Sequence, residues 1–268
     1  MNDPDTAQAD ISRFDPAFTE QILAKVGGAI NWYFRAEVRG IRSMPAGGAL
    51  VVSNHSGGMF TPDLLVFASA FYDAFGYDRA VYTLAHDTVY IGPFADWLPK
   101  LGVIHATREN AALALSEGGV VLVFPGGDYD AYRPTSEGNA IDFNGRCGYV
   151  RSALAAGVPI VPMVSIGAQE SQLFLTRGRG LAKKLGLDNR LRMDILPLSV
   201  GFPFGVSVLM PPNLPLPTKI VTKVLDPVDI TGVFGKDPDV EEVDAHIRAL
   251  MQEALDRLAK QRRFPIIG

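Results

Sequence analysis

Short apolar runs alternate with segments of helical periodicity along most of the chain. Runs rich in Val and Ile without polar alternation are typical of strands that are buried on both faces of a sheet. The predicted strands are Ala49–Ser53, Ala80–Ala85, Val120–Phe124, Pro159–Ser165 and Val221–Leu225. The predicted helices are Pro62–Tyr72, Gly92–Leu101, Arg108–Ser116, Gly148–Ala156 and Val240–Lys260. This alternation predicts an α/β fold with a mixed, largely parallel sheet flanked by helices.

Two further apolar segments each allow two interpretations. Residues 16–36 have helical spacing and include Trp32 and Tyr33, so this helix either packs on the core or lies in a membrane interface, which favours both residue types. Residues 195–218 carry no charge, but their prolines argue against a membrane-spanning helix. We expect a buried strand at 206–210 between apolar loops, and the alternative is an apolar lip that touches lipid.

Composition and charge narrow the class of protein. The 268 residues are 47% hydrophobic and 20% charged, which is typical of a globular protein. A net charge of −4 lacks the basic character of a nucleic-acid-binding protein. Cys147 is the single cysteine, which excludes an intramolecular disulfide and a zinc site of the CxxC type. The polar, acidic N-terminus has no secretory pattern, so we expect no signal peptide.

Polar residues follow the predicted strands at the points where ligands bind in open α/β sheets. His55 follows the first strand, and Asp63 lies in the first turn of the next predicted helix. An imidazole that takes a proton from a hydroxyl needs one free nitrogen, and a carboxylate on the other N–H fixes that tautomer. The pair is therefore a candidate general base and its orienting partner. Alternatively, His55 is a structural loop residue and Asp63 stabilises the helix dipole.

A metal site is the second chemical possibility in these loops. Its ligands would come from His55, His86, Asp87 and His105. No pair among them has the helical ligand spacing of known zinc motifs. We therefore expect no bound metal.

Four blocks of sequence carry a resemblance to a known family. The blocks are "VVSNHSGGMFTPD" (51–63), "LGVIHATREN" (101–110), "VLVFPGGDYD" (121–130) and "GVPIVPMVSIG" (157–167). In this order they resemble the motifs of the glycerolipid and lysophospholipid acyltransferases, whose first motif is N-H-x4-D. The first block is most similar to a divergent branch with N-H-S-G and a longer loop before P-x-D. The resemblance implies a glycerol-3-phosphate acyltransferase-like domain at residues 45–268, after an N-terminal helical segment at residues 1–44.

The resemblance also implies an activity. A fatty acyl group moves from acyl-CoA or an acyl carrier protein to a hydroxyl of a glycerolipid, a lysophospholipid or another lipid alcohol, with no other cofactor. His55 is the implied general base, Asp63 supports it, and the Gly57–Gly58 turn is a candidate oxyanion site. The implied substrate-binding residues are Ser56, Gly57, Arg108, Gly126, Gly127, Asp128 and Arg133. The implied location is the cytoplasmic face of a membrane, as a peripheral or monotopic protein, and the candidate walls of an acyl groove are Phe60, Phe124 and Met163.

The third block departs from the family pattern and leaves the acceptor open. Gly126 stands where the family has glutamate, and Tyr129 stands where it has arginine. In the family these residues help to bind the acceptor, often through its phosphate. The sequence therefore allows a neutral acceptor, such as a monoacylglycerol, a diacylglycerol or a long-chain alcohol, as well as a phosphorylated one. Two other functions remain: a hydrolase in which the same pair activates water, and a non-catalytic lipid-binding protein.

Overall fold

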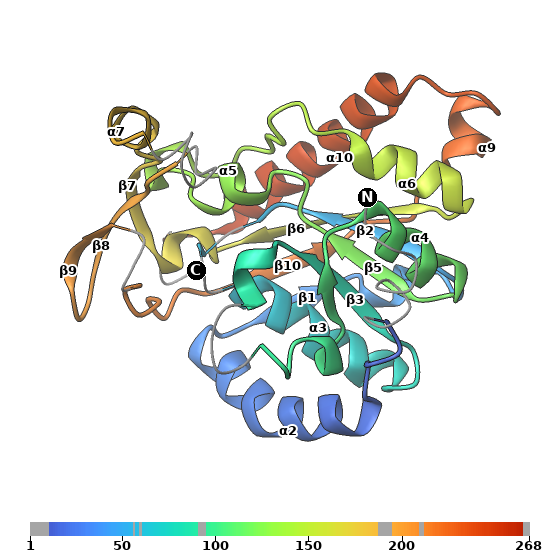
Figure 1. Ribbon diagram of the computed structural model, residues 1–268, viewed down its shortest axis with the longest axis horizontal. Coiled ribbons are helices and arrows are strands. Elements are labelled where there is room, and N and C mark those ends of the chain that lie inside the picture. The colour runs from blue at the N-terminus through green and yellow to red at the C-terminus, as the bar shows by residue number, and fades with distance from the viewer. Residues whose placement is uncertain are drawn as a thin grey trace.

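The protein is built around two sheets that lie side by side (Figure 1). The computed structural model describes residues 11–55, 57–58, 61–90, 95–186, 195–208 and 212–264. A seven-stranded sheet forms the centre of the molecule, and a three-stranded sheet lies beyond one end of it. Two of the candidate residues, Ser56 and Phe60, fall outside the described residues.

The seven-stranded sheet is mixed and largely parallel, as the sequence predicts. In spatial order its strands are β1 (Glu37–Arg39), β10 (Val221–Val224), β6 (Ile160–Ile166), β2 (Ala49–Ser53), β5 (Val120–Val123), β3 (Val81–Ala85) and β4 (Val103–His105). Strand β10 is antiparallel to β6 and parallel to β1, and the pairs from β6 to β4 are all parallel. Strand β1 thus brings residues 37–39 of the N-terminal segment into this sheet.

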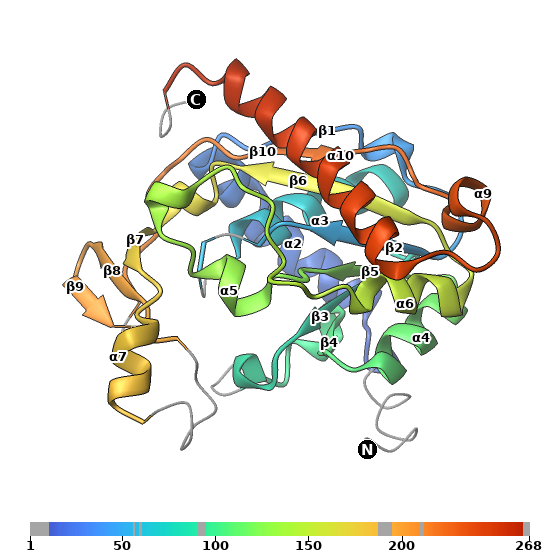
Figure 2. The same cartoon turned by 90° about the horizontal axis from the view of Figure 1, so that it is seen from above.

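Helices cover both faces of this sheet (Figure 2). One face carries α2 (Pro16–Tyr33) and α3 (Pro62–Phe75), and the other carries α4 (Arg108–Ser116), α6 (Gly148–Ala156) and α10 (Val240–Gln261). Successive strand residues point to opposite faces. Leu50 and Val52 of β2 accordingly pack with the second group of helices, whereas Ala49 and Val51 pack with the first. Both faces are apolar because both are buried.

The three-stranded sheet was only partly expected. Its antiparallel strands are β7 (Leu173–Thr176), β8 (Leu198–Gly201) and β9 (Gly205–Val208). The strand predicted at 206–210 is confirmed for residues 206–208. Its predicted burial holds for Ser207 but is wrong for Val206 and Val208, which are 65% and 39% exposed. Residues 209–210 lie outside the described residues. An apolar run shows that a strand can form but does not show what covers its outer face.

The predicted helix at Gly92–Leu101 is wrong in its described part. Residues 95–98 form turns and Pro99–Leu101 form a short 3-10 helix. Proline is favoured only in the first turn of a helix, where its missing N–H needs no partner, and Pro99 accordingly begins a new element. Gly102 then turns the chain into β4 with φ +79, and a Cβ on this glycine would lie 2.3 Å from the carbonyl oxygen of Val81.

None of the helices in the described ranges is both long enough and apolar enough to cross a membrane. Helix α2 instead packs along α3, where Gly27 lets the two helices approach closely: a Cβ there would meet Ser69 Oγ at 3.1 Å. The opposite side of α2 leaves Trp32 79% exposed. The helix thus packs on the core along one side and exposes Trp32 near its C-terminal end.

Candidate active site

The candidate site lies at the carboxyl ends of β2 and β5, on the side of the three-stranded sheet (Figures 1 and 2). Asn54 fixes the chain just before His55. Its side chain donates to the carbonyl of Ser165 at 2.9 Å and accepts from the N–H of Ser165 at 2.8 Å. These two bonds tie the end of β2 to β6, so the half-buried His55 leaves the sheet in a defined direction.

The third sequence block meets His55 directly. The His55 ring packs against Phe124, which follows β5, with the ring centroids 4.6 Å apart. The backbone N–H of His55 donates to Asp130 Oδ2 at 2.6 Å. Asp130 belongs to the short helix α5 (Gly127–Ala131) and is 1% exposed. Two motifs 75 residues apart therefore converge on one histidine.

Asp130 is held by a buried ion pair with Arg133. The guanidinium of Arg133 donates to Asp130 Oδ1 and to the carbonyl of Ala140, and the side chain is only 3% exposed. Burial raises the pKa of Asp130 to about 6, although Arg133 and the N–H of His55 both act in the opposite direction. The sequence predicts that Arg133 binds substrate. In the structure its guanidinium is engaged by Asp130 and Ala140, and its contact with a substrate stays a prediction.

Asp63 lies where the first block predicts it. It is the second residue of α3, directly after Pro62, and is 1% exposed. Its Oδ1 accepts the N–H of Leu64 at 3.1 Å. A buried carboxylate thus follows the loop that His55 begins, and its pairing with the imidazole stays a prediction.

The glycine turn between them packs against the three-stranded sheet. Gly57 and Gly58 have φ +84 and +61, which favour glycine. A Cβ on Gly58 would lie 2.6 Å from Phe174 Cζ of β7, so no larger residue fits without a shift. The N–H of Gly58 donates to the carbonyl of Ala131 at 3.2 Å. This bond occupies one of the candidate oxyanion donors.

The absence of the family glutamate at position 126 has a steric explanation. A Cβ at Gly126 would lie 2.4 Å from the Cβ of Asp130. Because a Cβ atom cannot rotate away, a glutamate at 126 and the present position of Asp130 exclude one another. Gly127 has φ +50, and a Cβ there would meet Arg146 Nη1 at 2.7 Å. The observed positions of Asp130 and Arg146 therefore require glycine at both residues.

Two arginines that the sequence did not single out support this block. Arg146 donates to the carbonyl of Gly126 at 2.9 Å and to Asp128 Oδ1 at 3.0 Å. Arg177 donates to the carbonyl of Tyr129 at 3.0 Å and lies over the Tyr129 ring, 4.1 Å from its centroid. Both come from distant segments, so no local spacing could have revealed them.

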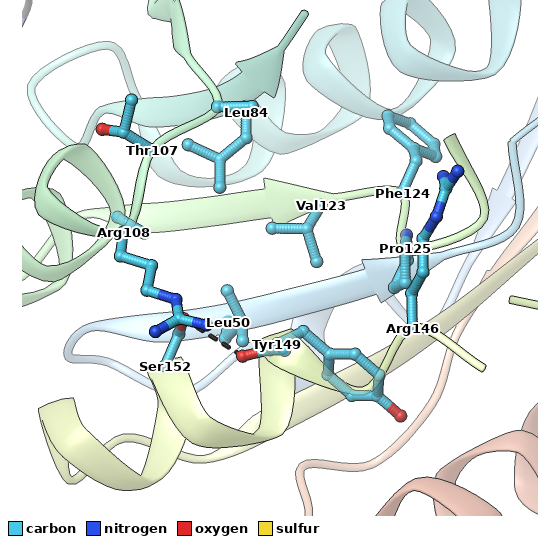
Figure 3. A pocket seen from close by; sticks show the side chains of 13 residues that line it. Leu50, Leu84, Thr107, Arg108, Val123, Phe124, Pro125, Arg146, Tyr149 and Ser152 are labelled. Atoms are coloured by element: carbon cyan, nitrogen blue, oxygen red, sulfur yellow. Dashed lines mark hydrogen bonds between the residues drawn. The ribbon is translucent and has the colours of Figure 1, made fainter. Parts of the chain in front are cut away.

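A cavity of about 260 Å³ lies between the sheet and helices α4 and α6 (Figure 3). Arg108 and Arg146 stand at opposite ends of it, with Leu50 and Val123 between them. Arg108 occupies the first residue of α4 because Thr107 caps that helix by accepting the N–H of Asn110 at 3.1 Å. Phe124 lines the cavity and also packs on His55. An apolar cavity with charged ends thus adjoins the candidate base.

Other candidate residues have different surroundings. Met163 is 1% exposed and belongs to the core, so the expectation that it lines an open groove is wrong. His105 stacks on the ring of Tyr90, and its Nε2 lies 4.0 Å from Asp87 Oδ1. Within the described residues, no group of three or more His, Cys, Asp or Glu side chains is arranged to hold a metal ion.

Comparison with known proteins identifies the family. The acyltransferase family model matches residues 35–166. This range contains the first three sequence blocks, the fourth block up to Ile166, and Phe124 and Asp130, which contact His55. An uncharacterized protein of Mycobacterium tuberculosis is 31% identical over 262 residues, which cover 95% of this chain and 70% of that protein. The chain belongs to the acyltransferase family.

Two further similarities concern proteins with named activities. The "DGAT1/2-independent enzyme synthesizing storage lipids" of Mus musculus is 26% identical over 238 residues, covering 88% of this chain and 69% of that protein. The crystal structure of a 1-acyl-sn-glycerophosphate (LPA) acyltransferase, PlsC, from Thermotoga maritima matches with a TM-score of 0.58 at 18% identity. That match covers 90% of this chain and 79% of the PlsC chain. It confirms the glycerol-3-phosphate acyltransferase-like α/β fold.

Proposed function

We propose that the protein transfers a fatty acyl group from an acyl thioester to the hydroxyl of a glycerolipid, with His55 as the general base. The supporting observation is the convergence of two motifs at this residue: Asp130 holds its backbone N–H and Phe124 packs on its ring. Membership of the acyltransferase family supports the reaction class. No metal ion or other cofactor is needed, because the thioester of acyl-CoA or of an acyl carrier protein already carries an activated acyl group.

In the proposed reaction His55 removes the proton of the acceptor hydroxyl while the hydroxyl oxygen attacks the thioester carbonyl. Asp63 orients the ring and stabilises the imidazolium that forms. The tetrahedral intermediate collapses, the thiolate leaves, and His55 returns the proton to it, so the products are an ester and a free thiol. A well-placed general base contributes about 10²–10⁴-fold to such a step.

The apolar cavity beside Phe124 is the proposed site of the acyl chain. Its lining of Leu50, Leu84 and Val123 suits methylene groups. Arg108 at its other end is the proposed contact for an anionic group of the thioester donor. The protein is proposed to work on the cytoplasmic face of a membrane as a peripheral or monotopic protein, because its substrates reside in lipid.

A neutral acylglycerol is the proposed acceptor. Gly126 and Tyr129 replace the glutamate and arginine that assist phosphate recognition in the family, and Arg133 is engaged with Asp130. The mouse relative is named for the synthesis of storage lipids, which supports the same choice.

Product analysis tests this proposal. The purified protein is incubated with labelled oleoyl-CoA and, in separate reactions, with diacylglycerol, with lysophosphatidic acid or with no acceptor. We expect labelled triacylglycerol as the main product and little free fatty acid. Free fatty acid as the main product in every reaction would instead identify a hydrolase. Acyl-CoA binding without turnover would identify a non-catalytic lipid-binding protein.

A further inference from the structure

The three-stranded sheet has an unusual distribution of polar and apolar side chains. Its inner face carries buried polar groups beside Phe174: Ser199 and Ser207 share a hydrogen bond of 2.9 Å, and Asn213 donates to Ser207 Oγ at 3.2 Å. Its outer face is apolar, since Val200 pairs with Val206 and Leu198 pairs with Val208 across the strands. Antiparallel sheets with one solvated face normally show the reverse.

The tip of the same sheet is aromatic. Phe202 and Phe204, in the turn between β8 and β9, are 75% and 52% exposed. Leu175 of β7 and Leu214 after β9 are 58% and 55% exposed. Several large apolar side chains exposed on one small sheet mark a surface that contacts something other than water.

The C-terminal end of α2 extends this apolar surface. Tyr33 donates through its hydroxyl to the carbonyl of Pro215 at 2.6 Å, and the N–H of Leu214 donates to the carbonyl of Phe202 at 2.8 Å. The C-terminal end of α2 therefore lies at the same end of the molecule as the hairpin (Figure 1). Trp32, which precedes Tyr33 at this helix end, is 79% exposed. Exposed Trp and Phe beside aliphatic side chains are typical of proteins that insert into a bilayer interface.

Charge distinguishes a lipid surface from a protein partner. Helix α7 (Arg179–Lys184) follows β7 and exposes Arg179, Lys183 and Lys184 together with Leu181 and Leu185. In the described part of residues 173–217 the charged residues are Arg177, Arg179, Lys183 and Lys184, all basic, although the whole chain carries a net charge of −4. A basic, apolar surface on an acidic protein complements an anionic bilayer.

The position of this surface fits the proposed site. Phe174, on the inner face of the sheet, packs against Gly58 of the loop that begins at His55. Both views place the sheet beyond the carboxyl ends of the central strands (Figures 1 and 2). A bilayer that contacts the outer face would therefore lie on the same side of the molecule as the candidate base.

We propose that the outer face of the three-stranded sheet, with Phe202 and Phe204 at its tip and α7 beside it, docks the protein on an anionic lipid bilayer. This inference rests on the proposed function, because a lipid acceptor has to be drawn from a membrane. The two aromatic side chains enter the interface, and the lysines of α7 contact the lipid phosphates.

Vesicle sedimentation tests the docking surface. The full chain is mixed with vesicles of phosphatidylcholine alone or of phosphatidylcholine and phosphatidylglycerol in equal amounts. We expect the wild type to bind the anionic vesicles. The partition coefficient of Phe202→Ser/Phe204→Ser should be at least about tenfold lower. Lys183→Glu/Lys184→Glu should show a similar decrease, on anionic vesicles only.

A matched pair of valines provides the control. Val206 of β9 and Val233 of α9 (Ile230–Phe234) are 65% and 60% exposed, but α9 lies at the opposite end of the molecule (Figure 1). Val206→Ser is expected to weaken binding several-fold, whereas Val233→Ser leaves it unchanged. Equal effects of the two substitutions, wild-type binding by the double phenylalanine variant, or no binding by the wild type would each overturn the proposal. So would a dimer that the phenylalanine variant dissociates while vesicle binding persists.

Activity on a dispersed substrate separates this proposal from the proposed function. With a short-chain diacylglycerol below its micellar concentration, Phe202→Ser/Phe204→Ser is expected to transfer acyl groups at the wild-type rate. Vesicle binding without any acyl transfer would overturn the proposed function alone. Acyl transfer from vesicles that does not depend on the two phenylalanines would overturn the docking surface alone.

Discussion

The two sheets of this protein differ in what covers their apolar faces. All residues of β2 and β6 in the seven-stranded sheet are buried, and their apolar side chains meet helices on both faces. In the three-stranded sheet, Ser199 and Ser207 are buried whereas Val206 and Phe204 are exposed. The first sheet is stabilised by burial of its apolar side chains on both faces. The second has hydrogen bonds between buried side chains on its inner face, and its apolar outer face is exposed.

The contact between the two sheets gives the largest expected effect. Phe174 of β7 is 5% exposed and packs against Tyr132 and the Gly58 turn. Phe174→Ala is expected to cost about 3–5 kcal/mol of unfolding free energy and to lower acyl transfer, because the loop after His55 loses its support. Phe174→Leu keeps most of the volume and should cost less than about 1.5 kcal/mol. Full activity of Phe174→Ala in the transfer assay would show that the three-stranded sheet does not support the loop after His55.

A pH-dependent effect is expected at Asp130, which lies in the segment between the two sheets. Its folded pKa of about 6 lies above the ordinary value of 3.8. Well below pH 3.8 the carboxyl is protonated in both states, and as the pH rises to 6 the unfolded chain loses this proton first. The wild type should therefore lose about 2 kcal/mol of unfolding free energy relative to Asp130→Asn between pH 4 and pH 7.

Urea unfolding of both proteins at the two pH values measures this difference. A wild type that gains stability relative to Asp130→Asn as the pH rises would contradict the prediction. Acyl transfer by Asp130→Asn should be slower at pH 7, because the N–H of His55 loses a charged acceptor. A carboxylate that weakens the fold but supports His55 is expected of a functional residue.

One substitution made in both sheets gives the smallest effect and the cleanest comparison. Val164 of β6 is completely buried, whereas Val206 of β9 is 65% exposed. Val164→Ala should cost about 2 kcal/mol of unfolding free energy, from lost transfer and a residual cavity. Val206→Ala should change it by less than about 0.5 kcal/mol, as measured by thermal or urea unfolding. A large cost at Val206 would mean that its side chain packs within the isolated protein.

The sequence predicts five of the seven strands of the central sheet, because uninterrupted apolar runs such as Val120–Phe124 require burial on both faces. The two edge strands β1 and β4 are three residues long and give no such run. It does not predict the outward face of β9, since an exposed apolar strand and a buried one have the same pattern. The first block singles out His55 as the candidate base. The contact of His55 with Asp130 could not be predicted, because it joins residues that only the fold brings together. Arg146 and Arg177 act across long sequence separations and have no motif of their own.

The rate of acyl transfer by His55→Ala tests the central claim most directly. His246 on α10 is exposed and far along the chain from the site, so His246→Ala is the matched control. With oleoyl-CoA and diacylglycerol, His55→Ala is expected to lower kcat by about 10²–10⁴-fold with little change in KM for the thioester, while His246→Ala retains the wild-type rate. A His55→Ala protein that forms the ester at the wild-type rate would contradict the account.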